Sequence, residues 1–160
     1  MNKRCFVLLV YSLLFAACEN DKLIELTEQC EFHENLLGSC FSGIGDCGYD
    51  EIVITDSESY QHFGNVIRIH PVNVDCDTAA LPYIDFNGYT LLGKRTSGGG
   101  CSAYYDRKIF KDKKDKRIIY KIEVQYGGAC AMLIGSWNWI SIPKLLEGYS
   151  VEFKVNQSYR

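Results

Sequence analysis

The side chains that could act as a general base in this chain are three histidines, His33, His62 and His70. Nucleophilic catalysis needs a cysteine, serine or threonine beside such a base, and a third group that orients the base. His62 lies next to Phe63 in a segment of helical pattern, and His70 ends a strand-like run before Pro71. These are ordinary structural positions, and no catalytic or cofactor motif surrounds them. The sequence therefore predicts a protein that is not an enzyme and carries no cofactor.

Two groups of residues have types that could bind a metal ion. Of Glu31, His33 and Glu34, only the two glutamates have the i,i+3 spacing that places ligands on one helix face. Asp75 and Asp77 lie in an acidic loop that lacks the regular acidic positions and the terminal glutamate of an EF-hand. We therefore expect no metal site.

Of the eight cysteines, Cys5 lies in an apolar N-terminal segment and Cys18 directly follows that segment. An even set of six remains, which in an exported chain indicates disulfides. None belongs to a C-x-x-C pair and no histidine clusters with them, so a zinc site is the weaker interpretation. The six candidates are Cys30, Cys40, Cys47, Cys76, Cys101 and Cys130. Many connectivities are open. The expected set is Cys40–Cys47 across a glycine-rich loop, Cys101–Cys130 between neighbouring strands, and Cys30–Cys76 by elimination.

Trp137 and Trp139 flank Asn138 and therefore point to the same face of a strand. If exposed, they would form a stacking platform for sugars or peptides; if buried, they would anchor the core. Ile140 and Ile142 make the other face of the strand apolar as well. We therefore expect a central strand covered on both sides, with the ligand platform as the alternative.

The rest of the chain predicts a mainly β (α+β) fold, an antiparallel sandwich or barrel-like sheet with one or two short helices, stapled by disulfides. Branched and aromatic residues separated by turn signals indicate strands. These strands are expected over 51–55, 66–70, 89–95, 102–111, 117–126, 131–142 and 149–155. Residues 56–64 predict a short helix that stops at Gly64, and 21–37 fit a second helix loosely. The glycine run 98–100 predicts a bend that lets Cys101 turn into its bridge.

Charge patterning argues against nucleic-acid binding. Of the 17 basic residues, Lys3 and Arg4 belong to the N-terminal segment, so 15 remain against 20 acidic residues, a net charge of −5. The basic run 111–117 is interleaved with Asp112 and Asp115. We therefore interpret this run as the solvated tip of a hairpin rather than a binding patch.

Residues 1–17 have the charged head, short apolar stretch and small-residue exit of a cleaved secretory signal. The stretch Leu14-Phe15-Ala16-Ala17-Cys18 resembles the lipobox of bacterial lipoproteins, in which the cysteine is acylated. An ordinary cleaved signal is the alternative. The acidic residues after Cys18 resemble the export tags of Bacteroidetes surface lipoproteins. The resemblance implies an envelope protein held by lipid at Cys18, in the outer membrane or at the cell surface. Residues 18–29 would form the lipidated N-terminus and tether, and 30–156 a single mainly β domain.

Residues 81–93, the glycine turn, two long strands and Ile142-Pro143-Lys144 resemble the PrcB C-terminal domain family of protease-complex-associated lipoproteins. The helix-like segment 54–63 is similar to the one that introduces such domains, so the likeness covers about 52–155. It implies a noncatalytic module that binds a protein partner, and it supplies no functional residue. The alternative is a surface glycan- or ligand-binding lipoprotein that uses Trp137, Trp139 and neighbouring tyrosines.

Overall fold

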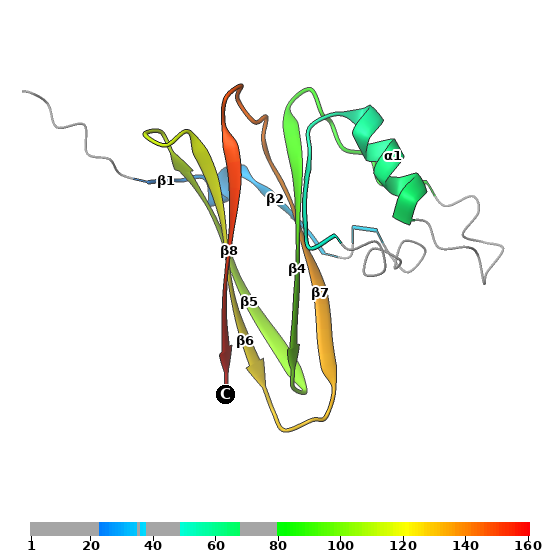
Figure 1. The fold of residues 1–160 in the computed structure, drawn as a ribbon, viewed down its shortest axis with the longest axis vertical. Helices are drawn as coiled ribbons and strands as arrows, with labels where there is room; N and C mark the ends of the chain where they lie inside the picture. Colours follow the sequence, from blue (N-terminus) through cyan, green and yellow to red (C-terminus); the bar gives the residue numbers. More distant parts are fainter. Residues whose placement is uncertain (1–22, 35, 38–48, 68–79) are drawn as a thin grey trace, which may run out of the picture.

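The computed structural model describes residues 23–34, 36–37, 49–67 and 80–160, which form two packed β-sheets and one helix (Figure 1). The strands follow the branched and aromatic runs of the sequence. The elements are β1 (Ile24–Glu25), the 3-10 turn η1 (Thr27–Gln29), β2 (Glu31–His33), β3 (Glu51–Ile54), α1 (Ser57–Ile67), β4 (Tyr89–Gly99), β5 (Ser102–Asp112), β6 (Arg117–Gly127), β7 (Leu133–Pro143) and β8 (Ser150–Tyr159).

Sheet A has the strand order β1-β5-β6-β8 and sheet B the order β2-β7-β4-β3. Figure 1 shows sheet A on the left, sheet B on the right, and α1 against the outer side of sheet B. The predicted mainly β sandwich is confirmed. One pairing departs from the expected antiparallel pattern, because β8 runs parallel to β6. The reason is that β7 crosses to sheet B, so the chain returns to sheet A in the direction of β6.

Alternation along β6 builds the core between the two sheets. Ile118, Tyr120, Ile122 and Val124 are buried, as the sequence predicts, whereas Lys121, Glu123 and Gln125 are not. These side chains pack with Ile109 of the neighbouring strand β5 and with Leu92, Ile140 and Ile142 of the facing sheet B. The two sheets are in tight contact at Gly98, where an added Cβ would meet the Tyr126 ring at 2.3 Å. Glycine leaves room for the Tyr126 ring because it has no Cβ.

A second core lies between sheet B and α1. Tyr60, Phe63 and Ile67 on one face of the helix pack with Ile52, Ile54, Leu91 and Trp139 of the sheet. The Trp139 ring is 5.9 Å from the Phe63 ring and lies directly over Gly93, where a Cβ would be 2.3 Å from it. Sheet B is therefore covered on both faces, and the expectation that the Trp139 strand is central is confirmed.

Two predicted elements are wrong, namely the helix over 21–37 and the start of the strand over 66–70. A helix over 21–37 is not formed: the described part holds β1, η1 and β2, whose strands pair with β5 and β7. The helix also does not stop at Gly64. It continues to Ile67 because Phe63, Gly64 and Ile67 share its buried face, and Gly64 lies against Leu81, whose Cδ1 is 2.4 Å from an added Cβ. Residues 66 and 67 are therefore helical; 68–70 lie outside the described residues.

The lower end of the sandwich in Figure 1 is closed by the expected Cys101–Cys130 disulfide, which joins the β4–β5 turn to the β6–β7 loop. Gly128 beside it has φ +84°, and a Cβ there would lie 2.5 Å from the Cys101 sulfur. The bend expected at 98–100 lies slightly later, at Gly100 and Cys101, because Gly98 and Gly99 are still paired with β7. At the opposite end, the basic run forms the β5–β6 hairpin turn, where Asp112 accepts backbone hydrogen bonds from Lys114 and Asp115. In the part of the chain that the structure describes, no helix is long and apolar enough to span a membrane.

Candidate functional site

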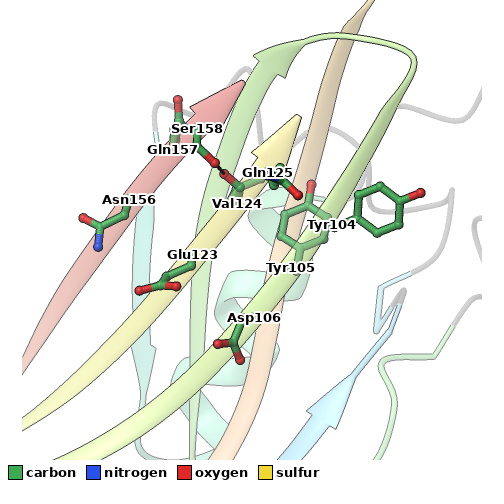
Figure 2. A pocket seen from close by; sticks show the side chains of 9 residues that line it. All are labelled: Tyr104, Tyr105, Asp106, Glu123, Val124, Gln125, Asn156, Gln157 and Ser158. Carbon is green, nitrogen blue, oxygen red and sulfur yellow. Dashed lines mark hydrogen bonds between the residues drawn. The ribbon is translucent and has the colours of Figure 1, made fainter. Parts of the chain in front are cut away.

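The outer face of sheet A carries exposed side chains from β5, β6 and β8. No helix or strand of the described residues packs over this face, although Ile119 on the outward side of β6 is only 4% exposed. Sheet B, in contrast, has α1 on one side and sheet A on the other. A shallow depression of about 540 Å³ lies on this face, near the end of the sheet that holds the disulfide. Its lining comes from β5, β6 and β8: Tyr104, Tyr105, Asp106, Glu123, Val124, Gln125, Asn156, Gln157 and Ser158 (Figure 2).

Strand register arranges the outward side chains of the depression in two rows. One row is Asp106, Glu123 and Asn156, and the next is Tyr104, Gln125 and Ser158. Figure 2 shows both rows crossing β5, β6 and β8 in order. The Tyr104 ring is 68% exposed and ends its row on the β5 side. The site therefore combines one aromatic ring with carboxylate, amide and hydroxyl groups on three hydrogen-bonded strands.

The charged groups beside the depression are balanced by ion pairs along each strand. Lys121 is 2.6 Å from Glu123, and this hydrogen bond, together with the lysine charge, lowers the pKa of the Glu123 carboxyl. Lys108 lies 3.6 Å from Asp106. A general acid at neutral pH needs a raised carboxyl pKa, whereas the pKa of Glu123 is lowered.

A row of three lysines, Lys108, Lys121 and Lys154, borders the depression on the next register position. Like charges opposite one another in a sheet are unfavourable unless other charges offset them. Each lysine here has an acidic partner on its own strand, Glu152 at 3.0 Å in the case of Lys154. Each positive charge of the row is therefore offset by a carboxylate beside it.

The two tryptophans lie on the helix-side face of sheet B. They stack on each other at 5.1 Å with an interplanar angle of 17°. Trp139 is 2% exposed, so no ligand reaches it, and Trp137 is half-buried at the edge of the helix-side core. A platform that uses both rings is not formed. The exposed ring of Tyr104 lies instead on the outer face of sheet A, which we call the Tyr104 face.

One arrangement of catalytic type lies on the other sheet. The Oγ atom of Ser141 is 2.7 Å from Nε2 of His33, whose Nδ1 is 3.9 Å from Oε1 of Glu31. Ser141 is 3% exposed, and its main chain lies between β2 and β4 in the sheet, which removes its N–H as an oxyanion donor. Burial outweighs the charge of Glu31 and lowers the pKa of His33, so the imidazole is neutral. The pair holds the short strand β2 on β7.

The remaining candidate residues are dispersed. His62 is exposed on α1, and His70, Cys40, Cys47, Cys76, Asp75, Asp77 and Cys18 lie outside the described residues. Glu34 pairs with Arg107 at 2.6 Å instead of joining Glu31 and His33. Within the ranges that the structure describes, no group of three histidine, cysteine or acidic side chains is placed to hold a metal ion.

The expected Cys30–Cys76 bridge is wrong, because Cys30 has a free thiol. The residue follows η1, and its Sγ donates to the backbone carbonyl of Leu26 at 3.2 Å. Burial raises the pKa of this thiol to about 11, so it is protonated at neutral pH and unsuited to nucleophilic attack. Cys30 and His33 also point to opposite faces of β2, since Cys30 packs on the inter-sheet core and His33 contacts Ser141.

Comparison with protein-family models, curated proteins and solved structures returned no match.

Sequence reasoning did not find the residues of the Tyr104 face. Tyr104, Gln125 and Ser158 belong to three strands, and only the register of β5, β6 and β8 brings them into one row. The sole signal in the sequence was alternation: every second residue of 104–108 and 121–125 is polar or charged except Tyr104. Because the alternation places position 104 on the solvent side of its strand, it predicts that the Tyr104 ring is exposed.

Proposed function

We propose that this chain is a lipid-anchored, noncatalytic binding module of the bacterial cell envelope, and that a protein partner binds the outer face of sheet A. The observation that supports this most is the contrast between the sheets. Among the described residues, both faces of sheet B are covered, whereas no helix or strand packs on the outer face of sheet A, where Tyr104 is 68% exposed. Exposed tyrosines on rigid scaffolds are favoured at the centres of protein interfaces.

The scaffold under this face is well suited to binding without rearrangement. Tyr104, Gln125 and Ser158 project from three long strands, of which β5 and β8 each pair with the central β6 along their length, and the Cys101–Cys130 bridge closes the nearest end. Ordering a mobile side chain or loop at an interface costs about 0.5–1.5 kcal/mol per side chain, so a face that is already ordered loses less on association. This favours recognition by a fixed surface.

The membrane attachment in this proposal is an acyl group on Cys18. The chain from Cys18 to the first strand at Ile24 spans at most about 20 Å when extended. A domain tethered in this way remains close to the membrane, with β1, the strand nearest the anchor, at one edge of sheet A. The intact mass of the native protein tests the attachment. An unmodified Cys18 in a protein that partitions as a soluble species would contradict it.

Affinity capture with the full-length chain from membranes in mild detergent tests the binding face. The variant carries Tyr104→Ser and Gln125→Ala, and the matched control carries Tyr83→Ser, a tyrosine that is 88% exposed and lies outside sheet A. Loss of a hot-spot tyrosine weakens binding about tenfold or more. We expect the native chain and the control to recover the same partner and the variant to lose it. Equal recovery by all three proteins would contradict the proposed face.

A second function, the binding of a surface glycan, is favoured by the composition of the same depression. An exposed tyrosine beside Asp106, Glu123, Gln125 and Asn156 offers a stacking surface next to acceptors and donors for sugar hydroxyls. Titration of the full-length chain with envelope polysaccharides, compared with Tyr104→Ser, separates the two functions. Saturable binding that depends on Tyr104 supports the glycan; capture of a protein with no glycan binding supports the protein partner.

A further inference from the structure

The strand β8 forms an open edge of sheet A. It runs over ten residues, pairs with β6 on one side, and has no strand on its other side among the described residues. The backbone N–H groups of Ser150 and Arg160 donate to the carbonyls of Lys116 and Tyr126 on the β6 side. Because successive residues of a strand point their N–H and C=O groups to alternate sides, the odd-numbered residues face the open edge. Val151, Phe153 and Val155 therefore present backbone donors and acceptors that pair with no strand among the described residues.

The same edge leaves part of the inter-sheet core uncovered. Val151, Phe153 and Val155 pack on that core but are only half-buried. On sheet B, Ile52 and Ile54 face the helix, so Val53 between them points to the inter-sheet side, where it remains 42% exposed. The edge of sheet A at β8 and the edge of sheet B at β3 lie on the same side of the sandwich. The Gln157 side chain of β8 donates to the carbonyl of Ser97 on β4, and β4 is the neighbour of β3.

The charges along β8 are complementary to those of a second, antiparallel copy of the same strand. On the outward face, Glu152 and Lys154 are separated by Phe153, and their side chains are 3.0 Å apart. If a second β8 lies antiparallel with Phe153 opposite itself, Glu152 faces Lys154 of the partner subunit and Lys154 faces Glu152 of the partner subunit. Opposite charges across such a pair are favourable, and like charges are not.

The backbone supports this register as well. Phe153 faces the open edge, so two copies exchange both N–H···O=C bonds there, and Val151 does the same with the partner's Val155. Glu152 and the partner's Lys154 then form the closer, non-hydrogen-bonded type of pair, in which side chains interact most. Centring the pairing one residue earlier or later would place Glu152 opposite Glu152, or Lys154 opposite Lys154.

We propose that the chain forms a two-fold symmetric dimer through antiparallel pairing of β8 with β8 of a second copy, centred on Phe153. The dimer joins the two copies of sheet A into one continuous sheet and covers the half-exposed valines and Phe153 at the edge. Long unprotected edge strands are a recognised site of pairing with another chain. The anchor-proximal strand β1 is at the opposite edge of sheet A, so lipid attachment leaves β8 accessible. The inference stands independently of the ligand of the Tyr104 face.

Two complementary variants test the dimer on the full-length chain in nonionic detergent, with mass measured by sedimentation velocity. Lys154→Glu makes both cross-strand pairs acidic, and Glu152→Lys makes both basic. We expect each variant alone to dimerise at least about tenfold more weakly than the native chain. An equal mixture of the two restores opposite charges in both pairs, so we expect it to dimerise as a heterodimer.

Lys108→Glu is the matched control, because Lys108 also has an acidic partner on its own outward face but lies on β5, away from the open edge. We expect this control to dimerise like the native chain, and circular dichroism verifies that each variant is folded. The mixture readout also separates loss of pairing from loss of folding, since misfolded chains would not recover on mixing. A native chain that remains monomeric, or a mixture no more dimeric than its parts, would overturn the proposal. An edge occupied only by another protein's strand would give the first of these results.

Discussion

The contact between Gly93 and Trp139 predicts that adding one methyl group to β4 destabilises the domain. The Cβ of Gly93→Ala would lie 2.3 Å from the indole ring of Trp139, a group that is fixed by Phe63 on one side and Trp137 on the other. Overpacking of this kind costs about 1–3 kcal/mol. The matched control is Gly135→Ala on β7, where an added Cβ has no atom within 4 Å. Its expected effect is near zero, or a gain of a few tenths of a kcal/mol, because alanine loses less backbone entropy.

A double-mutant cycle tests whether the ring causes the destabilisation. Trp139→Ala alone is expected to cost about 3–5 kcal/mol, since it removes a buried aromatic side chain from the helix-side core. In that background, Gly93→Ala meets a cavity instead of a ring, so it should cost nothing or stabilise. The coupling between the two substitutions is then about 1–3 kcal/mol. Urea unfolding followed by far-UV circular dichroism measures all four proteins. A Gly93→Ala variant as stable as Gly135→Ala, or additive effects in the double variant, would refute the packing described here.

Three further predictions concern the cysteines and His33. Replacing both Cys101 and Cys130 by alanine removes a bridge between positions 29 residues apart and should lower the free energy of unfolding by about 3–4 kcal/mol. Urea unfolding measures this change, and an unchanged midpoint would contradict the prediction. Cys30, with its pKa at about 11, should react slowly with a disulfide reagent at neutral pH and faster as the pH rises; a rapid reaction at neutral pH, lost in Cys30→Ser, would be inconsistent with a buried thiol. Burial lowers the pKa of folded His33 below its ordinary value of 6.5, so the unfolded chain binds the proton more tightly. The stability that neutral His33 contributes is fully present above pH 6.5 and is lost as the pH falls toward the pKa of the folded state. His33→Gln should therefore remove this part of the pH dependence of the free energy of unfolding. An unaltered pH dependence in the variant would contradict the prediction.

Much of the fold follows from local patterns in the sequence. The alternation along 118–125 identifies the buried face of β6, because one face of that strand contacts the core and the other is mostly polar, with the buried Ile119 as the exception. Cys101 and Cys130 were paired correctly since turn signals place both at ends of neighbouring strands. The apolar residues on both sides of Asn138 were sufficient to place β7 in the middle of a sheet.

What the sequence did not predict depends on register and direction between distant strands. Ser141 and His33 are 108 residues apart and meet only because β2 pairs with β7. The rows that contain Tyr104 require the register of three strands, one of which runs parallel because the chain crosses to the other sheet before it. Gly64 was predicted to end a helix because glycine commonly does, but tight packing against Leu81 gives it a place inside the helix.

The most direct measurement of the central proposal is site-specific photo-crosslinking in intact cells. A photoreactive phenylalanine replaces Tyr104 in one full-length chain and Tyr83 in a second, since both tyrosines are exposed but only Tyr104 lies on the outer face of sheet A. If this face binds a partner, illumination should give one discrete higher-mass adduct from position 104 and none of that mass from position 83. The same adduct from both positions, or no adduct from position 104, would contradict the account.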